Sequence, residues 1–322
     1  MKISVLGCGR WGSFLAWYQS VILGNDVVNF GLESEYSYQV LSKTRRNEWV
    51  KIDDKIEISC DLNYSIERAD IIIISISSQG LRGFVKEIVK HNIKGKRFVL
   101  CMKGIEESTG KRLTQVAEDE GINKDNIAVW VGPGHIQDFL RKVPNVMVID
   151  SYNNKLTDEL ADKFSSNLIK FYYGRDIIGT EIGAATKNIM GIAAGMLDGA
   201  SLKMLKGPLM ARGTREVARL IKGLGGNELS AYGLCHLGDY ETTLFSEHSH
   251  NRKWGEAYVN RQSFEGGLAE GVPTAFAVTK LAQKHNIRMP ITEAINRIIS
   301  TQSDFMTELN KVFEEIESKE EF

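Results

Sequence analysis

The spacing of apolar residues along this chain changes near residue 178. Before that point they gather in short runs, and we predict strands at residues 2–6, 26–30, 70–77, 97–102, 127–131, 145–150 and 169–173. The run at 70–77 is almost unbroken, which is typical of a strand that is buried on both faces of a parallel sheet. The first part of the chain is therefore predicted to be an α/β sheet with helices between its strands.

Beyond residue 178 the apolar positions recur every three or four residues, for example in the segments 208–224 and 274–285. That period predicts helices. A chain of 322 residues also exceeds what one hydrophobic core usually serves. We therefore expect two domains, an α/β domain at residues 1–178 and an all-α domain at residues 179–322.

A glycine-rich turn, GCGRWG, follows the first predicted strand and leads into a helix-like segment. Gly7 permits the tight turn, Gly9 lets the backbone approach a pyrophosphate, and Gly12 allows close packing of helix on strand. Arg10 and Trp11 lie between them. Such a turn also occurs without a ligand, but its place between strand and helix favours dinucleotide binding. We predict a Rossmann-like, doubly wound sheet for residues 1–178.

The end of the second predicted strand bears on the choice of cofactor. An acidic side chain about 20 residues beyond the glycines bonds a ribose 2′-hydroxyl, whereas an arginine accommodates a 2′-phosphate. Here the strand is followed by Leu32 and Glu33. Glu33 favours NAD, while Lys43, Arg45 and Arg46 in the next segment keep NADP possible.

Polar residues follow several other predicted strands. Ligands of open α/β sheets bind outside the carboxyl ends of the strands, so these residues are candidates for a site. They are Ser78 and Gln79 after the run at 70–77, Lys103 after the run at 97–102, and Gly132 and His135 after the run at 127–131.

The segment 181–199, EIGAATKNIMGIAAGMLDG, is small and apolar on nearly every side and contains one cation, Lys187. A helix that is apolar all round is usually buried, and a buried lysine must find a partner, lower its pKa or do chemistry. The alternative is a lysine whose stem lies along the core while its head reaches water. As part of the first helix of the second domain, Lys187 is expected to face the cleft between domains, which favours a functional site.

Composition excludes several classes of function. With 43% hydrophobic residues, 25% charged residues and a net charge of -1, no global field attracts nucleic acid or an anionic membrane. No apolar run approaches the ~18 residues of a membrane span, and the first residues pass straight into a strand without a signal peptide. The four cysteines have no metal-like spacing. We expect a cytoplasmic protein with reduced thiols and no metal.

The second domain contains further polar motifs, LGDYETT at 237–243 and SHNR at 249–252. Taken alone, Asp239 reads as a helix cap and Arg252 as a surface charge. A longer series of motifs along the chain is more specific. In order, these motifs are GxGxWG, SSQxLR, KGIE, GPGH, GAATKNIMGIAAG, LMARG, LGDxxxT, HNR and EGVPTA. In this order the series resembles the NAD(P)-dependent sn-glycerol-3-phosphate dehydrogenases of bacterial type, and the likeness covers nearly the whole chain.

The resemblance implies reversible hydride transfer between the nicotinamide and C2 of a glycerol phosphate, giving dihydroxyacetone phosphate in the oxidative direction. It implies catalytic roles for Lys187, the acid/base residue, and for Lys103 and Asp239. The substrate contacts it implies are Lys103, Gly132, His135, Asn188, Asp239, Thr243, His250, Asn251 and Arg252. The cofactor contacts it implies are Gly7, Gly9, Arg10, Trp11, Gly12, Glu33, Ser78, Gln79, Lys103, Arg252 and Glu270. It also implies a homodimer that serves glycerophospholipid biosynthesis.

The chemistry of the residues agrees with that role for Lys187. Reduction of a ketone needs a proton for the developing alkoxide, and a lysine partly desolvated by small neighbours such as Gly191 can have its pKa lowered toward a useful range. Asp239 would oppose that shift at close range, so we expect it to orient the lysine or bond a substrate hydroxyl. Lys103 adds a second cation, which disfavours charge on both and attracts a dianionic phosphate.

Three positions depart from the family pattern. Met204 stands where the family usually has an asparagine two residues before Lys206, His250 where it commonly has an arginine, and Leu32 where the second strand often ends near an arginine. A histidine lacks the fork with which arginine holds phosphate. Two alternatives stay open: a relative that acts on another phosphorylated or carboxylated hydroxy compound, and an NAD(H)-binding sensor without turnover. Lys187 argues against the sensor, which needs no proton donor.

Overall fold

The computed structural model describes residues 1–266 and 269–315, and these group into two compact units. Unit 1 comprises Met1–Met102 and Leu113–Ile177, and unit 2 comprises Lys103–Arg112 and Ile178–Phe322. Our division of the sequence at residue 178 did not anticipate that the segment Lys103–Arg112 groups with the second unit.

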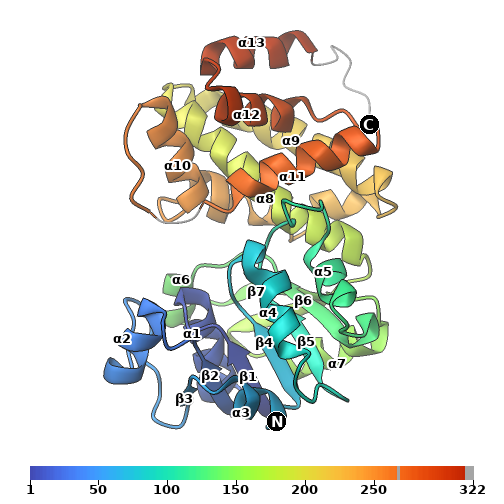
Figure 1. Ribbon diagram of the computed structural model, residues 1–322. Coiled ribbons are helices and arrows are strands. Elements are labelled where there is room, and N and C mark those ends of the chain that lie inside the picture. The colour runs from blue at the N-terminus through green and yellow to red at the C-terminus, as the bar shows by residue number, and fades with distance from the viewer. Residues whose placement is uncertain (267–268, 316–322) are drawn as a thin grey trace. The chain divides into compact units, whose positions relative to one another are not determined.

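Unit 1 is built on one eight-stranded sheet (Figure 1). In spatial order the strands are β3 (Glu57–Ser59), β2 (Asp26–Phe30), β1 (Lys2–Leu6), β4 (Ile71–Ile74), β5 (Arg97–Leu100), β6 (Ile127–Val131), β7 (Asn145–Ser151) and β8 (Ile169–Tyr173). Neighbouring strands are parallel except for β6 and β7, which are antiparallel. The order reverses between β1 and β4, which is the switch point of a doubly wound sheet, so the predicted Rossmann-like fold is confirmed.

The predicted strands are all present, with differences at their ends. The runs at 70–77 and 97–102 end as strands at Ile74 and Leu100, because the chain turns there into loops at the carboxyl edge of the sheet. The short edge strand β3 was not predicted, since three residues give too little alternation to read.

Helices connect the strands of unit 1. They are α1 (Arg10–Trp17), α2 (Tyr36–Thr44), α3 (Leu62–Glu67), α4 (Leu81–Ile88), α5 (Leu113–Asp119), α6 (Ile136–Leu140) and α7 (Asn154–Phe164). The buried Trp130 of β6 packs edge-on against Tyr18, which follows α1, and against Phe171 of β8. The Tyr18 hydroxyl donates to the Phe164 carbonyl oxygen at 2.6 Å, so this aromatic cluster also satisfies its polar atom.

The second unit is helical over its main segment (Figure 1). Its helices are α8 (Ile177–Gly199), α9 (Lys206–Gly223), α10 (His250–Val259), α11 (Gly271–Lys284), α12 (Pro290–Thr301) and α13 (Phe305–Glu315). Every residue of α8 from 179 to 198 is buried, as its all-round apolar pattern led us to expect.

Glycines allow α8 and α10 to touch through their backbones. A Cβ at Gly195 would lie 1.8 Å from the Arg252 carbonyl oxygen, and one at Gly255 would lie 2.2 Å from the Ile192 carbonyl oxygen. No side chain fits at either position without moving a helix. The small residues of α8 therefore serve close helix packing, and they do not leave its buried face open to water.

A buried carboxyl group from α9 holds the first turn of α12. Glu216 is 1% exposed and accepts the backbone N–H groups of Ile291 at 2.8 Å and Thr292 at 2.9 Å, together with the Thr292 hydroxyl at 2.6 Å. These bonds satisfy donors that have no partner within α12. Burial raises the pKa of Glu216 to about 7.

We predict that Glu216→Ala lowers the free energy of unfolding by about 2–3 kcal/mol, because it leaves buried donors without a partner. Chemical denaturation followed by circular dichroism measures this. As a control, Glu314→Ala removes an exposed carboxylate at the end of α13 and should stay within about 0.5 kcal/mol of the wild type. Equal stability of the two variants would contradict the capping role.

Candidate active site

Lys187 lies inside unit 2 and its ammonium group is held there by two partners. The residue is 6% exposed, and its Nζ lies 2.5 Å from Asp239 Oδ2 and 2.8 Å from Thr243 Oγ1. The head group therefore does not extend to water along the core, which removes the snorkelling alternative for this lysine.

Asp239 is the centre of this network. It is fully buried in a short 3-10 turn, Leu237–Asp239, and its Oδ2 also lies 2.8 Å from Lys103 Nζ. The Thr242 hydroxyl donates to Oδ1, and the Thr243 hydroxyl donates to the Asp239 carbonyl oxygen at 2.8 Å. One carboxylate oxygen is thus shared by two ammonium groups, while neighbouring hydroxyls fix the rest of the turn.

Lys103 reaches this network because its segment belongs to unit 2 and packs against α8. Ile105 pairs with Arg112 in an antiparallel bridge, and the Ile105 side chain is fully buried in the core that contains Ile189 and Ile192 of α8. Arg112 forms an ion pair with Glu181 of α8, and both side chains are buried. These contacts anchor the hairpin on the same helix that bears Lys187.

A buried histidine joins the Asp239 turn to α8. Burial lowers the pKa of His236 to about 4, so its ring is neutral at physiological pH. Its Nδ1 lies 3.0 Å from the Gly183 carbonyl oxygen and its Nε2 lies 2.7 Å from the Tyr240 hydroxyl. These partners assign the proton to Nδ1, and Nε2 then accepts from Tyr240. The bridge therefore holds the turn on both sides of Asp239, at His236 and at Tyr240.

The charged groups of the network shift one another's pKa values. Burial lowers the pKa of Lys187 to about 7; Asp239 opposes this shift and Lys103 reinforces it. Burial alone raises the pKa of Asp239, but the two ammonium groups outweigh that effect and hold the pKa below its usual range. Asp239 thus opposes the lysine shift, as we expected, yet its approach does not cancel the desolvation. The network can exchange a proton near neutral pH.

The structure brings some of the other expected residues of unit 2 close to this network. Asn188 is buried next to Lys187 on α8. A Cβ at Gly191 would lie 2.8 Å from Thr243 Cγ2 and 3.2 Å from Asn251 Cβ, so α8 meets both of those side chains one turn after Lys187. Asn251 Oδ1 accepts the Gly271 backbone N–H at 2.9 Å.

Arg252 makes a different set of contacts. Its Nε lies 2.7 Å from Asp198 Oδ2, and Lys206 Nζ lies 2.6 Å from the same oxygen. Our sequence reasoning missed Asp198, and the available signal was an acid in the last turn of a helix that is apolar on nearly every side. His250 begins α10 with its ring 6.4 Å from that of Phe264. Glu270 immediately precedes α11.

The glycine turn of unit 1 has one open position. A Cβ at Gly7 would lie 2.1 Å from the Ser75 carbonyl oxygen, and one at Gly12 would lie 1.9 Å from the Gly7 carbonyl oxygen, whereas Gly9 has nothing within 4 Å. Gly9 also precedes α1, which has no side-chain cap and no acid in its first turn. The geometry fits a pyrophosphate held by the N-terminus of α1, as in dinucleotide-binding folds.

The other expected residues of unit 1 follow the carboxyl ends of parallel strands. Arg10 and Trp11 form the first turn of α1 after β1, Glu33 is exposed after β2, Ser78 and Gln79 follow β4, and Gly132 and His135 follow β6. Gln79 Nε2 lies 3.2 Å from Ser78 Oγ. Within the described part of the chain, no group of three His, Cys, Asp or Glu residues is placed to hold a metal ion, and no helix is long and apolar enough to cross a membrane.

Two family models together match most of the chain. The model for the N-terminus of NAD-dependent glycerol-3-phosphate dehydrogenase matches residues 2–157, and the model for the C-terminus of the same enzyme matches residues 176–310.

Individual proteins show the same likeness. The glycerol-3-phosphate dehydrogenase (NAD(P)+) of Prosthecochloris aestuarii is 33% identical over 310 residues, which cover 92% of each chain. That of Moorella thermoacetica is 34% identical over 311 residues, covering 92% of this chain and 91% of its own. The crystal structure of glycerol-3-phosphate dehydrogenase from Coxiella burnetii superposes with a TM-score of 0.90 at 26% identity, covering 97% of this chain and 98% of that chain.

We predict that Gly9→Ala and Gly12→Ala separate binding from folding. Gly9→Ala adds a Cβ in open space, so its stability should stay within about 1 kcal/mol of the wild type while NADH affinity falls by about tenfold or more. Gly12→Ala meets backbone and should lose about 1–3 kcal/mol of stability. NADH fluorescence titration and thermal unfolding measure the two effects. Unchanged NADH affinity in Gly9→Ala would contradict the assignment of this turn.

Proposed function

This chain belongs to the family of NAD-dependent glycerol-3-phosphate dehydrogenases, and we propose that it interconverts sn-glycerol 3-phosphate and dihydroxyacetone phosphate with Lys187 as the acid/base. It is accordingly an oxidoreductase that uses NAD(P). The observation that supports the proposed role of Lys187 is its contact with Asp239 and Lys103 in a buried network.

The proposed chemistry needs one proton at one atom of the substrate. When bound, the nicotinamide supplies the hydride to C2 of the ketone, or takes it up from C2 of the alcohol. In reduction, the Lys187 ammonium donates a proton to the oxygen on C2, and the neutral amine remains. In oxidation, the neutral amine accepts the hydroxyl proton. A pKa of about 7 suits both directions, because each protonation state is populated at neutral pH.

The neighbours of Lys187 have separate proposed tasks. Asp239 holds the lysine head in place through the 2.5 Å contact and keeps its own charge. Lys103, whose side chain is 23% exposed, adds positive charge that attracts a dianionic phosphate. Thr243 fixes the direction of the ammonium group because its hydroxyl oxygen accepts a hydrogen bond from Lys187 Nζ. We propose that Asn188, His250, Asn251 and Arg252 complete the substrate contacts of unit 2, while Gly132 and His135 stay predictions from the sequence.

A second candidate is a member of the family with a different substrate head group. His250 replaces the arginine that the family commonly has, and Arg252 and Lys206 share the carboxylate of Asp198. That carboxylate reduces the positive charge that these two cations offer to a phosphate. A phosphorylated or carboxylated hydroxy compound other than glycerol 3-phosphate is therefore the alternative to test.

We propose NAD as the preferred cofactor, in a cytoplasmic homodimer that supplies the phospholipid backbone precursor. Glu33 is exposed directly after β2, where a carboxylate suits a ribose 2′-hydroxyl. Arg45, one of the three basic residues that kept NADP possible, instead donates to the carbonyl oxygens of Asp53 and Ile56 and pairs with Asp54. The dimer and the pathway rest on the family resemblance.

The first test is an assay of purified protein with dihydroxyacetone phosphate and either NADH or NADPH. We expect turnover, with NADH preferred. Lys187→Met should lower kcat by about 10²–10⁴-fold, because it removes the proton donor while preserving volume, and NADH affinity should change less than about twofold.

The control variant is Lys90→Met, which removes an exposed lysine of unit 1 and should keep full activity. NADH binding without turnover would contradict dihydroxyacetone phosphate as the substrate. A panel of phosphorylated and carboxylated ketones would then distinguish the second candidate, which turns over one of them, from a sensor, which turns over none. A clear preference for NADPH would show that Glu33 does not decide the cofactor.

The pH dependence of kcat/KM gives an independent prediction. Ketone reduction needs the protonated lysine, so its rate should fall as pH rises through about 7, whereas oxidation of the alcohol should rise through the same pH. Lys103→Met removes the neighbouring cation, so both transitions should move to higher pH. Initial rates in both directions measure this. If Lys103→Met left both pH profiles unchanged, the result would contradict the effect of Lys103 on the pKa of Lys187.

A further inference from the structure

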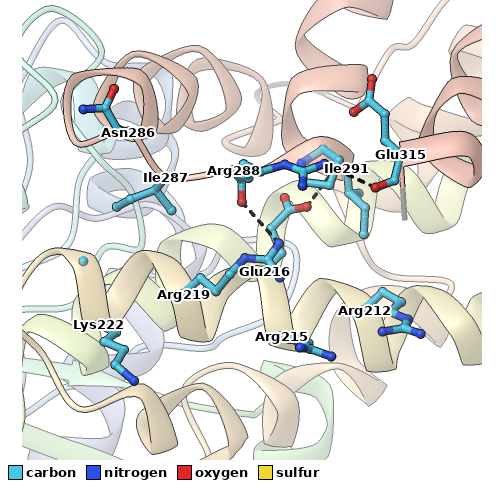
Figure 2. A pocket seen from close by; sticks show the side chains of 12 residues that line it. Arg212, Arg215, Glu216, Arg219, Lys222, Asn286, Ile287, Arg288, Ile291 and Glu315 are labelled. Carbon is cyan, nitrogen blue, oxygen red and sulfur yellow. Dashed lines mark hydrogen bonds between the residues drawn. The ribbon is translucent and has the colours of Figure 1, made fainter. Parts of the chain in front are cut away.

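A second region of unit 2 has the character of an anion site. A cavity of about 460 Å³ lies between α9 and the segment that joins α11 to α12 (Figure 2). Its cationic side chains are Arg212, Arg215, Arg219 and Lys222 of α9 and Arg288 of the joining segment. None of the residues of the Lys187 network lines it.

The two acidic residues that line this cavity do not neutralise it. Glu216 directs its carboxyl group to the first turn of α12, where it accepts two backbone N–H groups and a hydroxyl. Glu315 accepts a guanidinium N–H of Arg288 through its backbone carbonyl oxygen, and Figure 2 shows its side chain turned away from that contact. Positive charge therefore dominates the lining.

Among these cations, Arg212 and Arg215 have the most N–H donors left for a ligand. Both are partly buried, and across residues 1–266 and 269–315 neither forms an ion pair or a side-chain hydrogen bond. A guanidinium group has five N–H donors in a planar fork that matches the oxygens of a phosphate. By comparison, Lys222 pairs with Glu228, and Arg219 donates to the Arg288 carbonyl oxygen.

The spacing of the cations indicates the shape of the ligand. Positions 212, 215, 219 and 222 fall on one side of a helix, and at 1.5 Å per residue they extend over about 15 Å. Like charges three or four residues apart repel each other, and an anion laid along the row would relieve that repulsion. The row is longer than a single phosphate group, so several anionic groups in line fit it better.

We propose that this cavity binds a polyphosphate chain, either inorganic or at the end of a nucleoside, in contact with Arg212 and Arg215. A compact ligand of this kind fits a cavity of about 460 Å³ in a protein whose net charge of -1 gives no general attraction for nucleic acid. The proposed site lies outside the proposed catalytic network, and its occupation does not depend on turnover.

The test is isothermal titration of the full-length protein with inorganic triphosphate, at constant ionic strength and with NADH at tenfold its dissociation constant. We expect one equivalent to bind about tenfold or more tightly than sulfate, because several guanidinium contacts act together. Arg212→Gln combined with Arg215→Gln should weaken triphosphate by about tenfold or more. ATP in a parallel arm distinguishes a nucleoside triphosphate, which would bind more tightly, from the phosphate chain alone.

The matched control removes two charges from α11 of the same unit, with Lys280→Gln combined with Lys284→Gln. Both are exposed and neither lines the cavity, so triphosphate affinity should change less than about twofold. Thermal unfolding checks that both double variants fold. The proposal would be overturned if both double variants lost the same triphosphate affinity, or if triphosphate bound no more tightly than sulfate. Displacement of triphosphate by dihydroxyacetone phosphate would overturn it as well. Failure of catalysis with intact triphosphate binding would count only against the proposed enzyme function.

Discussion

The sharing of one Asp239 carboxylate oxygen by two lysines is the interaction on which the proposed active site depends. In water, a carboxylate between two ammonium groups would leave both lysines charged. Inside unit 2 the desolvation of Lys187 outweighs the attraction of Asp239, and Lys103 disfavours the charge further. The buried carboxylate keeps its charge because two cations face it. The result is a lysine that is held in place by an ion-pair contact and yet titrates near neutral pH.

The fold provides this arrangement by burying α8 from every side. Gly195 of α8 and Gly255 of α10 let the two backbones touch, and the Lys103–Arg112 hairpin covers another part of the helix through Ile105 and the Arg112–Glu181 pair. Water is thereby excluded from the lysine stem. The partial exposure of Lys103 leaves the network accessible on that side. A helix of large apolar residues would bury a lysine too, but it would keep α10 and its polar residues farther away.

A second carboxylate sets the charge of the neighbouring region. Asp198 binds both Lys206 and Arg252 at the end of α8, so these two cations already share a partner. This shared carboxylate, together with His250, is the reason to test substrates with other head groups. The basic cavity on α9 differs in kind, because Arg212 and Arg215 form no ion pair with a carboxylate among the described residues.

The sequence by itself determined every strand of unit 1 except β3, together with the glycine turn, the buried character of α8 and the family, because periodicity, turn chemistry and motif order are properties of neighbouring residues. It named Lys103, Lys187, Asp239 and Thr243 and, through the family resemblance, grouped them in one site, but it did not give the contacts between them. Lys103 and Asp239 are 136 positions apart, and only the docking of a hairpin places them 2.8 Å from each other. The bridge from His236 to Gly183 and the capture of Arg252 by Asp198 likewise join distant segments. The balance between desolvation and charge at Lys187 was also decided by tertiary structure, because burial and distance, which fix a pKa, are properties of the packed chain.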